Sequence, residues 1–130
     1  MKPRFKSLAF ADALHSRWPA GLRWEEKMDG VFEVVPVQLG QILGERMSSG
    51  EFFAFDLRGP EFDRAPLRER LVALDALTGQ LGLLRPAVGC GGEFLEAVLA
   101  RGGEGVVVKD LAGLPGATWT KIKQIGRAHV

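Results

Sequence analysis

Residues 24–35, with the sequence WEEKMDGVFEVV, contain the pattern that decides the fold and the chemistry of this chain. The apolar residues on each side of Asp29-Gly30 predict two strands, and an Asp-Gly pair between strands is typical of a tight hairpin turn. Lys27 comes at the end of the first strand, just before this turn. A lysine amine attacks an electrophile only in its neutral form, which desolvation and neighbouring cations favour. Taken alone, the Lys-x-Asp-Gly motif is more typical of a solvent-exposed hairpin lysine than of a nucleophile.

The rest of the chain is interrupted often by Gly and Pro, which indicates short strands and tight turns. Strands are predicted at residues 22–27, 31–35, 41–47, 51–57, 105–108 and 118–125, and helices at residues 8–18, 67–77 and 93–99. The first helix is predicted to place Leu8, Ala11, Leu14 and Trp18 on one side. In the second, leucines form an apolar stripe while Arg68, Glu69 and Arg70 face water. We therefore expect an α+β fold with strands paired mostly as antiparallel hairpins.

The size and composition of the chain limit the class of protein. Its 130 residues fit one domain, and 46% hydrophobic with 25% charged residues is ordinary for a globular protein. No apolar run is long enough to span a membrane, and no signal peptide is recognisable at the N-terminus. Cys90 is the only cysteine, which excludes an internal disulfide and favours a reducing cytoplasm. His15 and His129 cannot form a metal site alone, so a hard cation would need carboxylates and substrate phosphates.

Positive charge is concentrated near the two ends of the chain, although the net charge is only +1. The basic residues there are Lys2, Arg4, Lys6, Lys121, Lys123 and Arg127. Solvated termini would explain this pattern, and so would a surface that binds an anion. Lys121 and Lys123 lie two apart in a predicted strand, so both project from one face of the sheet. Such a like-charged pair is unfavourable unless an anion, such as a nucleotide phosphate, lies nearby.

Five short segments carry a family resemblance. In chain order they are Lys27 to Gly30, Gly44-Glu45, Phe55-Asp56, Glu104 to Lys109, and Trp119 to Lys123. This order resembles the conserved motifs of covalent nucleotidyltransferases, which include DNA ligases, RNA ligases and mRNA capping enzymes. Residues 55–123 look closer to bacterial ATP-dependent DNA ligases than to capping enzymes. The resemblance implies a nucleotidyltransferase (ATP-grasp-like) core formed by residues 1–130 as one minimal adenylation domain.

The resemblance also implies an activity. In this family the lysine amine attacks the α-phosphorus of ATP, pyrophosphate leaves, and the AMP is passed to the 5′-phosphate of a broken strand before the 3′-hydroxyl displaces it. We therefore expect ATP and Mg²⁺ as cofactors and nicked DNA as the substrate. An RNA ligase is the nearest alternative. The other alternative is a nucleotide- or nucleic-acid-binding module that has lost turnover.

Individual roles follow from position in the family motifs. The resemblance implies Lys27 as the nucleophile, Lys121 and Lys123 on the α-phosphate, Glu104 on Mg²⁺, Glu45 on a ribose hydroxyl, Phe55 stacked on adenine, Asp29 supporting the lysine loop, and Glu25 framing the adenine pocket. Lys109 is expected to matter less, because strand parity places it opposite Glu104. Trp119 is expected to be a packing residue.

The sequence departs from the family pattern in two places. Phe32 stands where ligases usually carry an arginine that contacts the nucleotide, so adenylation or the later use of the nick is expected to be impaired. Only seven residues follow Lys123, which leaves no room for the OB-fold domain that DNA ligases append. A minimal stand-alone enzyme, a subunit completed by a partner protein and a fragment all fit this length.

Overall fold

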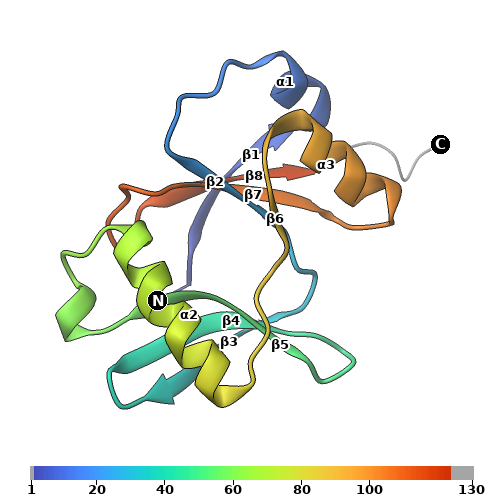
Figure 1. The fold of residues 1–130 in the computed structure, drawn as a ribbon. Coiled ribbons are helices and arrows are strands. Elements are labelled where there is room, and N and C mark those ends of the chain that lie inside the picture. Colours follow the sequence, from blue (N-terminus) through green and yellow to red (C-terminus); the bar gives the residue numbers. More distant parts are fainter. Residues whose placement is uncertain (1, 124–130) are drawn as a thin grey trace.

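The computed structural model describes residues 2–123, whose strands form two sheets, one above the other in Figure 1. The upper sheet has the order β1(Arg4–Ala9), β8(Thr118–Lys123), β7(Gly105–Asp110), β2(Leu22–Glu26) and β6(Val88–Gly89). The lower sheet is a meander of β3(Val31–Val37), β4(Gly40–Arg46) and β5(Phe52–Arg58). The helices are α1(Phe10–His15), α2(Leu67–Leu81) and α3(Gly91–Ala100), with a 3₁₀ turn at η1(Pro60–Phe62). All strand pairs are antiparallel except β1 with β8, so the predicted fold class is confirmed.

Each sheet has its own apolar core. The upper core joins the inward residues of α1 and α3 to Trp24, Val106, Val108 and Ile122. The lower core joins the leucines of α2 to one face of β4 and β5. Alternate residues of the same strands, including Val107 and Phe55, belong to neither core and turn toward the space between the sheets. The helices therefore leave one face of each sheet free to form a site.

The hairpin predicted at Asp29-Gly30 is wrong, because β2 and β3 belong to different sheets. The segment between them crosses from the upper sheet to the lower one instead of turning back. Gly30 is needed for close packing: a Cβ there would lie 2.6 Å from the carbonyl oxygen of Arg46. The Asp-Gly signal thus marked a close approach to β4. The predicted pairing of β4 with β5 around Ser48-Ser49-Gly50 is confirmed.

The N-terminal helix prediction is also largely wrong. Residues 4–9 form β1, which pairs in parallel with β8, and α1 covers only Phe10–His15. Of the described side chains of α1, only Ala13 is buried, while Leu14 is exposed. The pairing with a strand more than a hundred residues away outweighed the local helical spacing. Elsewhere, α2 and α3 extend the predicted helices, and residues 124–125 of the last predicted strand lie outside the described residues.

Arg70 was expected to face water, but it is buried against Asp56 of β5. Its guanidinium donates to Asp56 Oδ1 at 2.9 Å and to the carbonyl oxygens of Ala65 and Gly113 at 2.7 and 3.1 Å. Asp56 also accepts from Arg58 and from the backbone N–H of Leu57. This network joins α2 to β5 and to the loop after β7.

Gly105 has a backbone conformation that residues with a Cβ atom rarely adopt. Its φ is +153°, and a Cβ would lie 2.0 Å from the carbonyl oxygen of Ile122. We expect Gly105→Ala to lower the free energy of unfolding by about 1–3 kcal/mol, through strain and overpacking. Gly79→Ala is the matched control, because open space surrounds this helical glycine and alanine favours helix by about 0.5–1 kcal/mol. Urea unfolding of both variants measures the difference, and equal stability of the two would contradict this account.

Candidate active site

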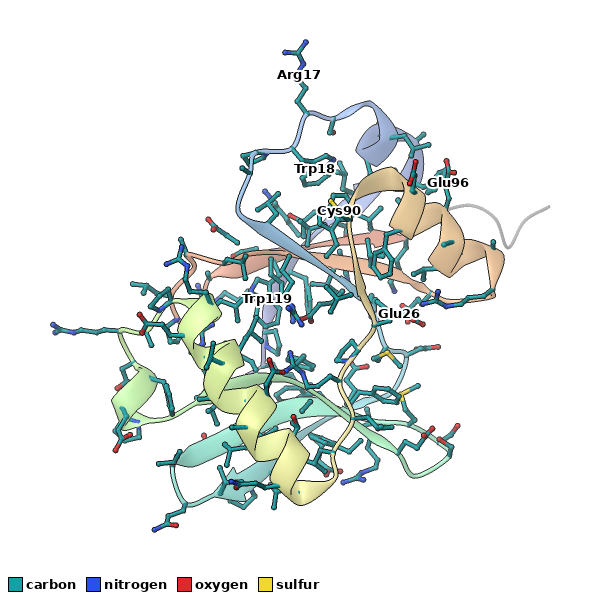
Figure 2. The ribbon with its side chains drawn as sticks, in the orientation of Figure 1. Arg17, Trp18, Glu26, Cys90, Glu96 and Trp119 are labelled. Atoms are coloured by element: carbon teal, nitrogen blue, oxygen red, sulfur yellow. The ribbon has the colours of Figure 1, made fainter. Side chains whose placement is uncertain are left out.

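A small hollow, partly open to solvent, lies between the two sheets. Figure 2 shows side chains, Trp119 among them, filling the space between the sheets. The lining residues come from both sheets and their connections: Phe5, Glu25, Glu26, Lys27, Met28, Glu45, Phe55, Pro86, Val107, Lys109 and Trp119. Four of the predicted site residues, Glu25, Lys27, Glu45 and Phe55, are therefore brought together here.

Lys27 directly follows β2 at the edge of this hollow. Its backbone N–H donates to the carbonyl oxygen of Gly105 at 2.9 Å, which ties the lysine to the start of β7. Its Nζ lies 3.3 Å from Glu104 Oε1, and the side chain is only 16% exposed. Lys123 of β8 forms an ion pair with the same carboxylate oxygen. Lys27 and Lys123, nearly a hundred residues apart, thus meet at one carboxylate.

Glu104 is held between two ammonium groups. Burial alone would raise the pKa of its carboxyl, but the hydrogen bonds and charges of Lys123 and Lys27 outweigh burial and hold that pKa below its ordinary value. Its second oxygen, Oε2, is buried and accepts no hydrogen bond from the described residues. The carboxylate is therefore ionised and has one oxygen free to accept another ligand.

Lys121 lies further along β8, on the same face as Trp119 and Lys123. Its Nζ is 5.7 Å from the centroid of the Phe5 ring, and within residues 2–123 it forms no ion pair. It does not line the hollow. The structure therefore brings Lys123 to Lys27 and leaves Lys121 beside Phe5.

Glu45 and Asp29 flank the lysine from the lower sheet and the crossing segment. Glu45 Oε2 accepts the backbone N–H of Gly30 at 3.0 Å, which fixes the loop after Lys27. Burial raises the pKa of Glu45, and the charges of Glu104 and Asp29 add to this effect, against the Gly30 hydrogen bond and Lys27. Asp29 is exposed and borders a second, wider hollow together with Lys27 and Glu104.

Lys109 was predicted to lie on the face opposite Glu104, but its side chain lines the hollow. Its Nζ lies 4.0 Å from the ring centroid of Trp119 and 4.9 Å from that of Phe55, and it donates to Glu25 Oε1 at 2.6 Å. The parity argument failed because Glu104 precedes β7 and the unusual φ of Gly105 breaks the alternation. Glu104 and Lys109 therefore both reach the space between the sheets.

Aromatic side chains from four strands form a row beside the hollow. Ring centroids are separated by 6.4 Å between Phe32 and Phe55, 5.8 Å between Phe55 and Trp119, and 6.0 Å between Trp119 and Phe5. Sequence reasoning missed Phe5, and it treated Trp119 only as packing. Trp119, Lys121 and Lys123 are spaced two residues apart and so share one face of the strand. This spacing was the signal that could have placed Trp119 in the site.

Glu25 is buried at the back of the hollow among cations. It accepts from Lys109 at 2.6 Å and from Arg23 at 2.5 Å, and Arg85 Nη2 lies 3.9 Å away. Burial alone would raise its pKa, but the charges and hydrogen bonds of Lys109 and Arg23 outweigh burial and lower it. Burial lowers the pKa of Lys109 in turn, against the attraction of Glu25. Glu25 thus fixes the position of Lys109 under the two aromatic rings.

We expect Glu25→Gln to lower the free energy of unfolding at neutral pH by about 3–5 kcal/mol, because it leaves Lys109 buried without its counter-ion. The pKa of Glu25 is lower in the folded chain than in the unfolded chain, whose ordinary value is about 4.5. Its contribution is therefore fully present above that value and is lost as the pH falls through the folded pKa. Urea unfolding from neutral to acid pH should show the gap between wild type and variant closing below about pH 4.5.

The matched control for this series is Glu96→Gln, at an exposed position of α3 that forms no ion pair within the described part of the chain (Figure 2). Its stability should stay within about 0.5 kcal/mol of wild type at every pH. A gap for Glu25→Gln that is small, or that does not change with pH, would show that Glu25 and Lys109 are not coupled as described.

Two general features complete the description of residues 2–123. None of the described helices has both the length and the apolar character needed to cross a lipid bilayer. The described His, Cys, Asp and Glu side chains also form no group of three or more that could hold a metal ion.

The fold is that of the nucleotidyltransferase domain of ATP-dependent ligases, as three solved structures show. A mycobacterial DNA ligase D complexed with ATP matches with a TM-score of 0.64 and 20% identity, over 78% of this chain and 54% of that one. A DNA ligase of the Lig E type matches with a TM-score of 0.67 and 16% identity, over 95% and 69%. An archaeal ATP-dependent RNA ligase matches with a TM-score of 0.62 and 19% identity, over 95% and 48%.

Sequence comparison points to the same group. The chain is 35% identical to a probable DNA ligase of Kineococcus radiotolerans, in an alignment of length 105 that covers 72% of this chain and 20% of that protein. It is 44% identical to a probable DNA ligase of Anaeromyxobacter sp., in an alignment of length 87 that covers 60% of this chain and 16% of that protein. This chain thus spans a fifth or less of the length of these relatives, and no protein-family model matches it. The predicted resemblance to ATP-dependent DNA ligases is confirmed.

Proposed function

We propose that this chain is an adenylation core of the ATP-dependent polynucleotide ligase type, in which Lys27 becomes covalently linked to AMP. The observation that carries the proposal is the meeting of Lys27 and Lys123 at Glu104, on the edge of a hollow lined by aromatic rings. A nucleophilic amine, a second cation and an ionised carboxylate are the groups that transfer of a nucleotidyl group needs.

The first step uses the Lys27 amine, which attacks the α-phosphorus of ATP after losing a proton. The new N–P bond forms as the bond from the α-phosphorus to the bridging oxygen breaks, and pyrophosphate leaves with the electron pair. Lys123 is placed to offset negative charge on the α-phosphate. Lys121 would assist from its place further along β8, once its side chain turns from Phe5 toward the phosphates.

The nucleotide is proposed to enter the hollow between the sheets. Phe55 offers its ring face to adenine. Glu45 would accept a hydrogen bond from a ribose hydroxyl while it keeps the Gly30 N–H fixed. Asp29 supports the loop that carries Lys27, and Glu25 frames the back of the pocket through Lys109.

Mg²⁺ fits the carboxylate of Glu104, because its Oε2 is buried without a partner among the described residues. A hard cation takes oxygen ligands and keeps several from water and phosphate, which agrees with one protein carboxylate at this site. Bound there, the cation would neutralise phosphate charge.

The polynucleotide is proposed to be nicked DNA, since the relatives identified by sequence are named probable DNA ligases. RNA is the alternative substrate, favoured by the fold of the archaeal RNA ligase. We propose a cytoplasmic setting on the basis of the single cysteine, Cys90. A partner protein that supplies OB-fold functions would assist the later steps. Those steps would also be affected by Phe32, which stands where ligases usually carry an arginine.

Intact-mass measurement tests the adenylation step. The purified chain is incubated with ATP and Mg²⁺, with GTP in place of ATP, and with ATP and a chelator. We expect the mass of one adenylyl group to be added only with ATP and the metal. A folded chain that gains no mass across pH and divalent metals would support the binding-module alternative. Sealing of nicked DNA, nicked RNA and hybrid duplexes of one sequence then decides the substrate.

A further inference from the structure

The edge of the upper sheet next to the hollow is rich in positive charge. Strands β1 and β8 contain Arg4, Lys6, Lys121 and Lys123 and no acidic residue. Lys121 and Lys123 share the sheet face of Phe5 and Trp119, whereas Arg4 and Lys6 alternate with Phe5 and lie on the other face. Within residues 2–123, none of these except Lys123 forms an ion pair. In a chain whose net charge is only +1, this edge is a local excess of positive charge.

Phe5 gives the same edge an exposed aromatic face. It pairs directly with Trp119 across the parallel β1–β8 ladder, with the ring centroids 6.0 Å apart and an interplanar angle of 64°. Trp119 is buried, but Phe5 is 40% exposed although it lines the mouth of the hollow. β1 is the outermost strand of its sheet, so no described strand covers Phe5 from the other side.

Lys121 completes the arrangement. Its Nζ lies 5.7 Å from the Phe5 ring centroid and has no carboxylate partner in the described part of the chain. An exposed cation–π contact of this kind is weak, on the order of 0.5–1 kcal/mol. A phosphate beside the ring would give the ammonium a stronger, charge-assisted hydrogen bond.

We propose that Phe5, Trp119 and Lys121, here called the edge platform, bind a nucleotide of the polynucleotide strand beside the break. A base stacks on Phe5, which Trp119 supports from below, and Lys121 binds the attached phosphate. An aromatic ring with an adjacent cation is the combination that holds unpaired nucleotides irrespective of base identity. Because Phe5 and Lys27 line one hollow, the stacked nucleotide would lie next to the adenylated lysine.

The edge platform is distinct from the adenine position proposed at Phe55. Phe5 and Phe55 each contact Trp119, while no ring contact joins the two phenylalanines within the described residues. This inference rests on the proposed function, which makes a nicked polynucleotide the substrate. Binding of a nicked duplex to the edge platform can nevertheless be measured without adenylation.

The test uses fluorescence anisotropy of labelled duplexes with the full chain. The probes are nicked DNA, nicked RNA and an intact DNA duplex of one sequence. Phe5→Leu keeps an apolar side chain against Trp119 and removes the stacking face. It should raise Kd for the nicked duplex about 5- to 150-fold, the loss expected for one base–aromatic stack. Phe5→Trp should restore tight binding, and Val72→Ala, at an exposed apolar position of α2, should leave Kd unchanged.

The adduct assay is run on the same proteins, and Phe5→Leu should lower the yield of AMP adduct by a smaller factor than it raises Kd for the nick, although Phe5 lines the same hollow. Unchanged affinity of Phe5→Leu for the nick, or no binding of the nick by wild type, would overturn the edge platform. A parallel loss of adduct would also overturn it, by placing Phe5 in the ATP pocket. A wild-type chain that binds the nick through Phe5 but forms no adduct would instead defeat the proposed function and leave the edge platform intact.

Discussion

Lys27→Ala is expected to form no AMP adduct with ATP and Mg²⁺, under conditions in which wild type is modified. Lys123 also contacts Glu104, but it approaches from β8, so its amine does not replace the ε-amine of Lys27. Loss of a covalent nucleophile lowers the rate by about a thousandfold or more. Transfer of label from α-labelled ATP to protein measures this rate.

Lys27→Arg is the sharper comparison. Arginine keeps the positive charge beside Glu104, but its guanidinium stays protonated and cannot act as a nucleophile. We expect this variant to unfold like wild type and to form no adduct. Adduct formation by either variant at the wild-type rate would place the nucleophile elsewhere.

Asp56→Ala is expected to lower the free energy of unfolding strongly. Asp56 is fully buried and Arg70 is 1% exposed, so the variant leaves a guanidinium in the interior without its counter-ion. Breaking a buried pair on one side costs about 3–5 kcal/mol. Arg70 also joins α2 to the loop after β7 through Gly113, so the loss should reach both sheets. Urea unfolding, followed by fluorescence of the three tryptophans, measures the change.

Arg68→Ala is the control, because this neighbour on α2 is exposed and should change stability by no more than about 0.5 kcal/mol. A double-mutant cycle with Asp56→Leu and Arg70→Met then isolates the coupling. The double variant should be more stable than Asp56→Leu alone, since it buries no unpaired charge. A cost for Asp56→Ala as small as that of Arg68→Ala would contradict the network described for α2.

The sequence predicted several of the residues that gather at the hollow, but less of the strand pairing that brings them together. Short motifs in a fixed order located Lys27, Glu45, Phe55 and Lys123, all of which lie at or beside the hollow. The strands and helices with strong local patterns, such as α2 and the β4–β5 pair, were also predicted. In these segments the local hydrophobic period agrees with the final packing.

Most of the errors involve contacts that are distant in sequence. β1 forms because β8 pairs with it, and the local pattern of its own residues does not predict a strand. Arg70 looked like a surface residue because its partner, Asp56, lies on another element. Lys109 was misplaced because one glycine, Gly105, breaks the alternation that the parity argument assumed. Pairing between strands and burial of charge depend on tertiary structure, which single-sequence patterns do not contain.

Peptide mapping of the adenylated chain tests the central claim most directly. Trypsin cannot cleave after a modified lysine, so AMP on Lys27 should appear as one peptide covering residues 24–46, intact at position 27 and heavier by one adenylyl group. Mapping is done at neutral to alkaline pH, because a phosphoramidate bond is labile to acid. Cleavage after Lys27 at the wild-type extent, with the adenylyl group on another residue such as Lys109 or Lys123, would contradict the account.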